Sequence, residues 1–276
     1  MSPVLYPPSR PQSIGEVLDS AFRIFRATLL KSLPYSVLAT VAGQLQNIYL
    51  IVTGRPLHRF GGADPVWWAL YVLGAIVGCS LVNAILIRQV TIASGLQSVG
   101  SVALVEGFRK APAAIAMIVL VAAPVVVCIV PLAGVPPPYR SWSLLALGVF
   151  ASYVVVLLAC SWPALLIGRK GFWGSLRYSA HLVRGNWWRT LMIFLVAVMM
   201  IAVFVVAAGV LGGVLAQFAT ARDLAVTTAV SAVIVAGSAA IYGPFFISMA
   251  LALYGDLQAR KEGIDLERRI AGAPAG

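Results

Sequence analysis

Long apolar segments alternate along this chain with shorter segments in which polar and basic residues recur. The first shorter segment, 13–33, carries apolar residues at helical spacing: Ile14, Val17, Leu18, Ala21, Phe22, Phe25 and Leu29. Charged residues occupy the opposite face, and an apolar run follows directly. This pattern predicts an amphipathic helix that lies in a membrane surface and leads into a spanning helix.

The start of this helix has its own signature. Ser13 and Glu16 stand three residues apart, the spacing of a capping box in which each side chain reaches the other's backbone N–H. Asp19 and Arg23 follow at the i,i+4 spacing of a favourable ion pair. We therefore predict that a helix begins at this point.

Six apolar runs are each long enough for a hydrocarbon core that requires about 20 residues. They cover residues 33–52, 66–87, 111–130, 142–167, 190–215 and 224–253. The last run is longer than a bilayer requires, so we expect it to tilt or to kink at Gly243-Pro244. The prolines of 131–141 predict a loop that is not helical, because proline lacks a donor and clashes with the preceding turn.

Two further basic amphipathic segments, 101–110 and 168–190, precede the third and fifth runs. The sequence thus predicts an all-α integral membrane protein. Its six transmembrane helices would form three repeats, each an amphipathic surface helix followed by a transmembrane hairpin. Chance similarity of basic amphipathic segments is the alternative. We expect an irregular tail over 1–12, the membrane domain over 13–255 and a cytoplasmic tail over 256–276.

Composition agrees with a polytopic membrane protein, since 61% of the 276 residues are hydrophobic and 11% are charged. Soluble domains are about 25% charged. The formal charge of +11 could suggest nucleic acid, but basic loops held on the cytoplasmic side explain it better. We therefore expect no nucleic-acid partner. The first twelve residues contain no apolar run, so we expect no cleavable signal peptide.

The distribution of basic residues predicts that both termini are cytoplasmic. With that orientation, sixteen of the twenty Lys and Arg residues lie inside. The four outside are Arg55, Arg59, Arg140 and Arg222. The basic residues expected to bind anionic lipid headgroups lie on the three surface segments: Arg23, Arg26, Arg109, Lys110, Arg177 and Arg184.

The predicted spans contain amides but no ionisable side chain in their interiors, which argues against a proton relay. Gln44, Asn47 and Asn83 could line a polar cavity, but hydrogen bonding between helices is the favoured interpretation. The Gly74/Gly78 and Gly209/Gly213 pairs are expected to pack within the chain rather than between copies. Three cysteines and two histidines form no metal-binding or catalytic pattern, so no metal, cofactor or catalytic residue is predicted.

Both ends of the chain resemble a known family. The stretches RPQSIGEVLDSAFRIFR at 10–26 and LYGDLQARKEGIDLE at 253–267 are similar to the bacterial membrane domain associated with glycerophosphoryl diester phosphodiesterases. The matching residues are Ser13, Glu16, Asp19, Tyr254, Asp256, Arg260 and Glu262. The usual LYYD is here Leu253-Tyr254-Gly255-Asp256. The resemblance implies a six-helix membrane domain and no catalytic residue, because the enzyme activity belongs to a separate soluble domain for which this chain has no room.

These observations favour a non-enzymatic protein of the bacterial inner membrane. We expect it to organise lipids, chiefly anionic ones, or membrane protein partners at the cytoplasmic face. A transporter or lipid permease is the second hypothesis, motivated by the threefold repeat and the amides. A water-accessible cavity reaching Gln44, Asn47 and Asn83 would favour transport, while a filled core would favour the organising role.

Overall fold

The computed structural model describes residues 5–8, 10–53, 64–97, 99–132, 136–168, 170–218 and 224–272. Every regular element in these ranges is a helix. The helices are α1 (Ile14–Gly43), α2 (Leu45–Val52), α3 (Pro65–Ala93), α4 (Gly100–Leu132), α5 (Pro137–Leu157), α6 (Ser161–Leu166), α7 (Phe172–Val183), α8 (Trp187–Phe218) and α9 (Leu224–Gly272). The predicted all-α class is thus confirmed for the described chain.

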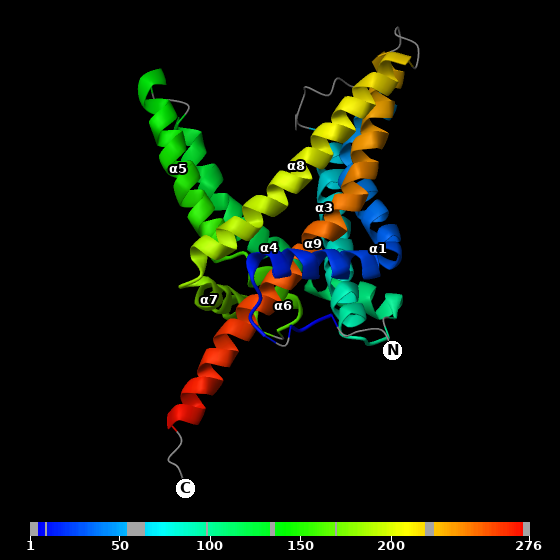
Figure 1. Ribbon diagram of the computed structural model, residues 1–276. Helices are drawn as coiled ribbons and strands as arrows, with labels where there is room; N and C mark the ends of the chain where they lie inside the picture. Colours follow the sequence, from blue (N-terminus) through cyan, green and yellow to red (C-terminus); the bar gives the residue numbers. More distant parts are fainter. Residues whose placement is uncertain are drawn as a thin grey trace.

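The helices form two arms that diverge from a common base (Figure 1). One arm is the α4–α5 hairpin. The other contains α8 and the first half of α9, with α3 beside them. The short helices α6 and α7 lie at the base, where the first half of α1 crosses α9. Residues far apart in sequence therefore meet at the base.

Four helical segments of the described chain are long and apolar enough to cross a membrane: Pro65–Ala93, Ser141–Leu166, Trp187–Val214 and Ala236–Gly263. In the second and third, only 11% of the most apolar stretch is buried inside the protein. Apolar surface of this extent requires an apolar surrounding, because its exposure to water is unfavourable. The chain is therefore a membrane-embedded helical protein.

The first predicted surface helix and the first predicted span are joined in α1, which continues to Gly43 with Pro34 inside it. The capping box of Ser13 and Glu16 is present, as predicted. The apolar face of α1 packs against other helices, whereas the prediction placed it in the membrane surface. Val17, Ala21 and Ile24 are buried in the main core, where α1 packs on α9 and α3, so these residues contact protein and not lipid.

The second surface segment and third span are likewise one helix, α4. Its small residues Ala103, Gly107, Ala111 and Ala114 are buried. A Cβ atom on Gly107 would lie 2.5 Å from the carbonyl oxygen of Ser80, so only glycine lets α4 approach α3 this closely. The larger side chains on its other faces point outward, as described below.

The prediction for 131–141 was wrong in part. Helix α4 continues to Leu132, and α5 already begins at Pro137 with Pro136 as its N-cap. Proline is tolerated at the first helical position, because the N–H that it lacks has no partner there. The predicted fourth span, 142–167, is divided between α5 and α6 by a short turn at 158–160.

Helix α9 runs without interruption from Leu224 to Gly272, across the predicted domain boundary at 255/256. Pro244 lies inside it, and Figure 1 shows a change of direction in its middle. Gln89 of α3 is fully buried here, and its amide donates to the Pro244 carbonyl at 2.9 Å. The Ser248 hydroxyl donates to the Gln89 side-chain oxygen at 3.1 Å. Sequence reasoning missed Gln89, which braces the bend.

The largest fully buried side chains are concentrated on the α9 segment 249–257: Met249, Leu251, Leu253, Tyr254 and Leu257. They pack with α1, α3 and α8 at the base of the arms. The core therefore lies where the helices cross, and the arms carry most of the exposed apolar surface.

Candidate functional site

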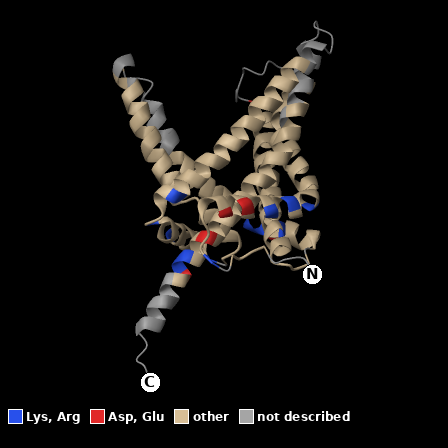
Figure 2. Cartoon of the chain, in the orientation of Figure 1, with Lys and Arg blue, Asp and Glu red and all other residues tan. Residues whose placement is uncertain are grey.

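Charged residues gather at the base of the molecule. Figure 2 shows most of the charged residues that it colours at this level, below two arms that are almost free of charge. We define the charged band as the Lys, Arg, Asp and Glu residues of segments 10–31, 88, 106–110, 170–189 and 256–262. A layer of charged residues next to helices that carry almost no charge is typical of the boundary between an aqueous face and a hydrocarbon core.

The six residues predicted to bind headgroups all belong to the charged band, but they differ in accessibility. Five have exposed side chains: Arg23, Arg26, Arg109, Arg177 and Arg184. The Arg23 guanidinium pairs with Asp19 at 2.7 Å. Lys110 differs, because its side chain is half-buried and turned toward α6. It therefore does not lie on the open surface with the other five.

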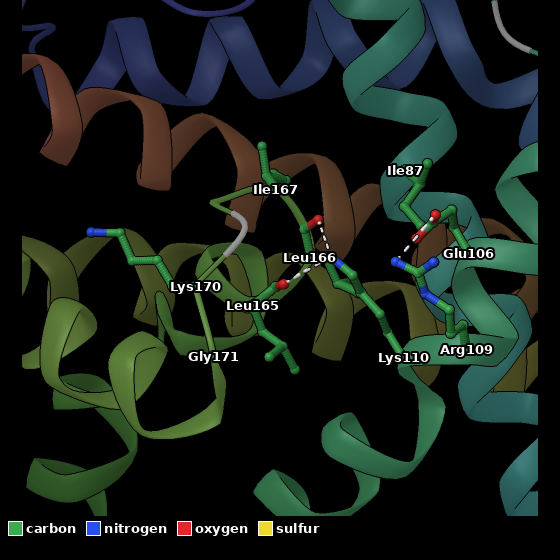
Figure 3. Close-up of a pocket in the computed structure, with 9 residues that line it drawn as sticks. All are labelled: Ile87, Glu106, Arg109, Lys110, Leu165, Leu166, Ile167, Lys170 and Gly171. Atoms are coloured by element: carbon green, nitrogen blue, oxygen red, sulfur yellow. Dashed lines mark hydrogen bonds and ion pairs between the residues drawn. The ribbon is translucent and has the colours of Figure 1, made fainter.

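A pocket of about 620 Å³ opens beside Lys110 (Figure 3). Its polar lining comes from Glu106, Arg109 and Lys110 of α4 and from Lys170, which follows α6. Ile87 of α3 and Leu166 of α6 supply apolar wall. Three basic residues and one acidic residue thus line the pocket beside apolar residues, and sequence reasoning did not group Lys170 with Arg109 and Lys110.

The position of Lys110 is fixed by the end of α6. Its ammonium donates to the carbonyl of Leu165 at 3.1 Å and to that of Leu166 at 2.9 Å. Carbonyls in the last turn of a helix have no partner within the helix, and a cation there also stabilises the helix dipole. Lys110 therefore holds α6 against α4, and its charge remains inside the pocket.

The two other cations are less constrained. The Arg109 guanidinium lies 3.6 Å from the Glu106 carboxylate, and its side chain is 72% exposed. The Lys170 ammonium lies 3.2 Å from the centre of the Tyr178 ring, in a cation–π contact. Burial raises the pKa of the Tyr178 hydroxyl, so the ring beneath the cation stays neutral. Both cations are near enough to the surface to change partners.

A second cluster, centred on Asp256, is buried. The Asp256 side chain has no solvent exposure, and one of its oxygens accepts from Arg189 Nε at 3.2 Å and Nη2 at 3.1 Å. The same oxygen accepts from Arg260 Nε at 3.1 Å. Its other oxygen accepts from the backbone N–H of Gln12 at 2.7 Å. The Gln12 carbonyl in turn accepts from both guanidinium groups.

The Asp256 cluster ties the N-terminal tail to the helices at the base. Tyr6 is buried, and its backbone N–H donates to the Ala93 carbonyl at 3.1 Å while its hydroxyl donates to Gln258 at 3.3 Å. The Tyr6 ring lies so close to Gly255 that a Cβ atom there would be 2.8 Å from it. Gly255 is therefore the residue that leaves room for the tail.

The amides predicted as a possible cavity do not converge. Asn83 is fully buried, donates to the Gly107 carbonyl at 3.2 Å and accepts from the Trp162 indole at 2.9 Å. It joins α3, α4 and α6, so the prediction of interhelical bonding is confirmed for Asn83. Gln44 and Asn47 instead bond each other at 2.6 Å, at the junction of α1 and α2.

The remaining residues of the proposed family motif have varied surroundings. Glu16 accepts from the Ser13 backbone at 2.6 Å and pairs with Arg10 at 2.7 Å. Two hydrogen bonds lower the pKa of the Glu16 carboxyl. The one from the Ser13 backbone has the larger effect, and the one with the Ser13 side chain has the smaller effect. Tyr254 is buried beside the Asp256 cluster, whereas Glu262 is exposed.

The predicted glycine contacts are confirmed for one pair. A Cβ atom on Gly74 would overlap the Ala42 carbonyl of α1, and one on Gly78 would lie 3.6 Å from the Ala39 carbonyl. Added Cβ atoms on Gly209 and Gly213 would meet nothing within 4 Å, so this pair does not pack within the described chain. Gly212 faces Ile234 of α9 instead.

Comparison of the chain with models of protein families, with curated proteins and with solved structures gives no match. The similarity of the two chain ends to a phosphodiesterase-associated membrane domain therefore stays a prediction. Function has to be argued from the charged band, the pocket and the buried Asp256 cluster.

Proposed function

We propose that this chain is a non-enzymatic protein of the bacterial inner membrane that organises lipids or partner proteins at the cytoplasmic face. Anionic phospholipids are its principal ligands. The proposal includes six spans, cytoplasmic termini and three units of surface helix plus hairpin. It places the charged band at the cytoplasmic boundary of the bilayer and the two arms within the hydrocarbon.

The observation that carries this proposal is the charged band at the base of the apolar arms (Figure 2). Basic residues near a membrane surface each contribute about 1 kcal/mol to binding anionic lipid. Arg26, Arg177 and Arg184 have exposed side chains in this band. They are therefore available to lipid headgroups at the level where a bilayer would present them.

The start of α4 supports the same arrangement. Val102, Val105 and Phe108, which the sequence groups on one face, are between 59% and 68% exposed. Arg109 follows immediately and is exposed too. Large apolar side chains next to an exposed cation are typical of a segment whose apolar part enters the acyl boundary while its charge stays at the headgroups.

A transporter has less support than an organising role. Asn83 forms its hydrogen bonds with the Gly107 carbonyl and the Trp162 indole, while Gln44 accepts from Asn47 at the junction of α1 and α2. Transport through a polar path would require these amides to share a cavity. Measured solute flux that is abolished by Asn83→Leu without a loss of stability would nevertheless favour the transporter over our proposal.

Orientation is tested with reporter fusions. Fusions after Arg59, Arg140 and Arg222 are expected to report the outer side, and fusions after Lys110 and Lys170 the inner side. An outer signal at Lys110 would contradict the proposed topology, because Lys110 belongs to the charged band. Each fusion retains all the preceding basic segments, which decide orientation during insertion.

Lipid binding is tested by gentle purification and mass spectrometry of the lipids and proteins that co-purify. The Arg177→Gln, Arg184→Gln double variant is expected to keep its topology, because many inner basic residues remain. It should retain less anionic lipid than the wild-type protein. Unchanged lipid retention in a correctly inserted variant would limit these arginines to a role in topology and would contradict the proposed lipid function.

A further inference from the structure

The pocket beside Lys110 combines features that an open basic surface does not have. It has a volume of about 620 Å³ and is lined by residues of α3, α4 and α6 together with Lys170 (Figure 3). Its three cations exceed its one carboxylate by two charges. Because Arg109 is held by Glu106 only at 3.6 Å, a stronger anion can displace this contact.

Of the three basic residues that line the pocket, Lys110 is the one whose position is fixed. Lys110 is bound to the end of α6 through two carbonyls, so its ammonium cannot swing out to solvent without breaking both bonds. Figure 3 shows the Arg109 guanidinium beside Lys110, whereas the Lys170 ammonium is directed away from Lys110, over the Tyr178 ring. An anion in the pocket would therefore meet Arg109 and Lys110 as they stand, and Lys170 once its exposed side chain turns from the Tyr178 ring.

We propose that this pocket binds the phosphate of one anionic phospholipid, with Arg109 and Lys170 contacting the phosphate oxygens and Lys110 supplying the charge beneath them. The apolar wall of Ile87 and Leu166 accommodates the glycerol and the first methylene groups. The proposal rests on the proposed function, because it requires the charged band to lie at a bilayer surface.

The surroundings of the pocket favour a lipid over a soluble phosphate ester. Val105 and Phe108 belong to the same turns of α4 as Glu106 and Arg109, and both are exposed. Farther along the helix, Ile118 and Val119 are also exposed. An acyl chain attached to a phosphate in the pocket can therefore follow an apolar surface toward the bilayer, a contact that a soluble ester would lack.

The test compares two double variants of the full chain with the same change in charge. Arg109→Gln, Lys170→Gln removes the two accessible cations of the pocket. Arg10→Gln, Lys31→Gln removes two exposed cations of the charged band that neither line the pocket nor belong to the six residues expected to bind headgroups. Both pairs have exposed side chains, so neither double variant disturbs the core, and circular dichroism confirms that helix content is unchanged.

Each delipidated protein is titrated in detergent with short-chain phosphatidylglycerol, and bound lipid is counted by native mass spectrometry. The wild-type chain is expected to bind one molecule saturably. The pocket variant should bind it about 30-fold more weakly, since each near-surface cation contributes about a factor of five. The control variant should stay within about threefold of wild type, and Arg109→Lys, which keeps the charge, should retain most of the affinity.

Other outcomes overturn the proposal in separable ways. Equal weakening in both double variants would exclude the pocket while leaving the charged band, and hence the proposed function, intact. Unchanged affinity in both, with no anionic lipid in the purified wild-type protein, would reject the pocket and the proposed function together. Binding of glycerol phosphate as tight as that of phosphatidylglycerol would replace the lipid with a soluble phosphate ester.

Discussion

Removal of the Asp256 carboxylate is expected to be one of the most damaging single changes at the base of this protein. Asp256→Ala leaves two guanidinium groups and the Gln12 N–H without their common acceptor. The side chain is fully buried, so water cannot replace it directly. The two guanidinium charges that remain would be largely buried without a carboxylate partner.

The size of the effect follows from the exposure of the partners. Removal of one member of a buried ion pair costs about 3–5 kcal/mol. The side chains of Arg189 and Arg260 retain 19% and 26% exposure, which lets water solvate part of each guanidinium in the variant. We therefore expect the lower end, about 3 kcal/mol. Asp256→Asn keeps an oxygen acceptor and should lose less.

Asp19→Ala provides the matched control. Asp19 also pairs with an arginine, Arg23 at 2.7 Å, and also stands at i,i+4 spacing from it, but both side chains are more than half exposed. Exposed pairs of this kind contribute about 0.3–0.5 kcal/mol. The two variants thus remove the same chemical group from pairs that differ chiefly in burial.

The assay is reversible unfolding of the purified full chain in mixed micelles with an increasing fraction of denaturing detergent, followed by tryptophan fluorescence. Hydrogen exchange of residues 5–12 reports whether the tail is released in Asp256→Ala, as the bonds to Gln12 predict. A free energy of unfolding for Asp256→Ala within about 0.5 kcal/mol of that for Asp19→Ala would refute the reasoning that burial makes the Asp256 cluster important.

Three further outcomes are expected. Gly74→Ala should lower the free energy of unfolding markedly because its methyl group meets backbone, whereas Gly78→Ala, with room for a Cβ atom, should change it little; equal effects would contradict the described packing. Asn83→Leu and Trp162→Phe should show a coupling of about 0.6–1.7 kcal/mol in a double-mutant cycle, and additivity would show that their bond contributes nothing. Since the pKa of Glu16 lies below its ordinary 4.5 in the folded chain, its stabilising effect is complete above that pH and is lost as the pH falls through the lowered value; NMR titration of the carboxyl group measures this, and an unshifted value would contradict it.

Local patterns were sufficient to predict the helical class and many helix ends. Helix α1 starts where Ser13 and Glu16 predict it, since a capping box requires only residues three positions apart. The four long apolar helices follow from composition, because their outward faces must match an apolar surrounding. The six-span count, the cytoplasmic termini and the threefold repeat stay predictions.

Errors in the sequence analysis occurred where neighbouring helices decide the outcome. The apolar face of α1 was assigned to the membrane surface, but periodicity alone cannot distinguish a face that contacts lipid from one that contacts α9. Pro136 and Pro137 were read as helix breakers, although their position at the N-terminus of α5 makes them compatible with a helix.

The candidate site depends almost entirely on tertiary structure. The sequence placed Arg109 and Lys110 on a basic segment, but only the approach of α6 turns Lys110 inward and brings Lys170 to the same pocket. Asp256 and Gln12 are 244 positions apart, and no local pattern links them. By itself, the sequence determined which segments are helical and apolar, because those properties depend on near neighbours. Tertiary structure decided which charges meet, because that depends on how helices distant in sequence cross.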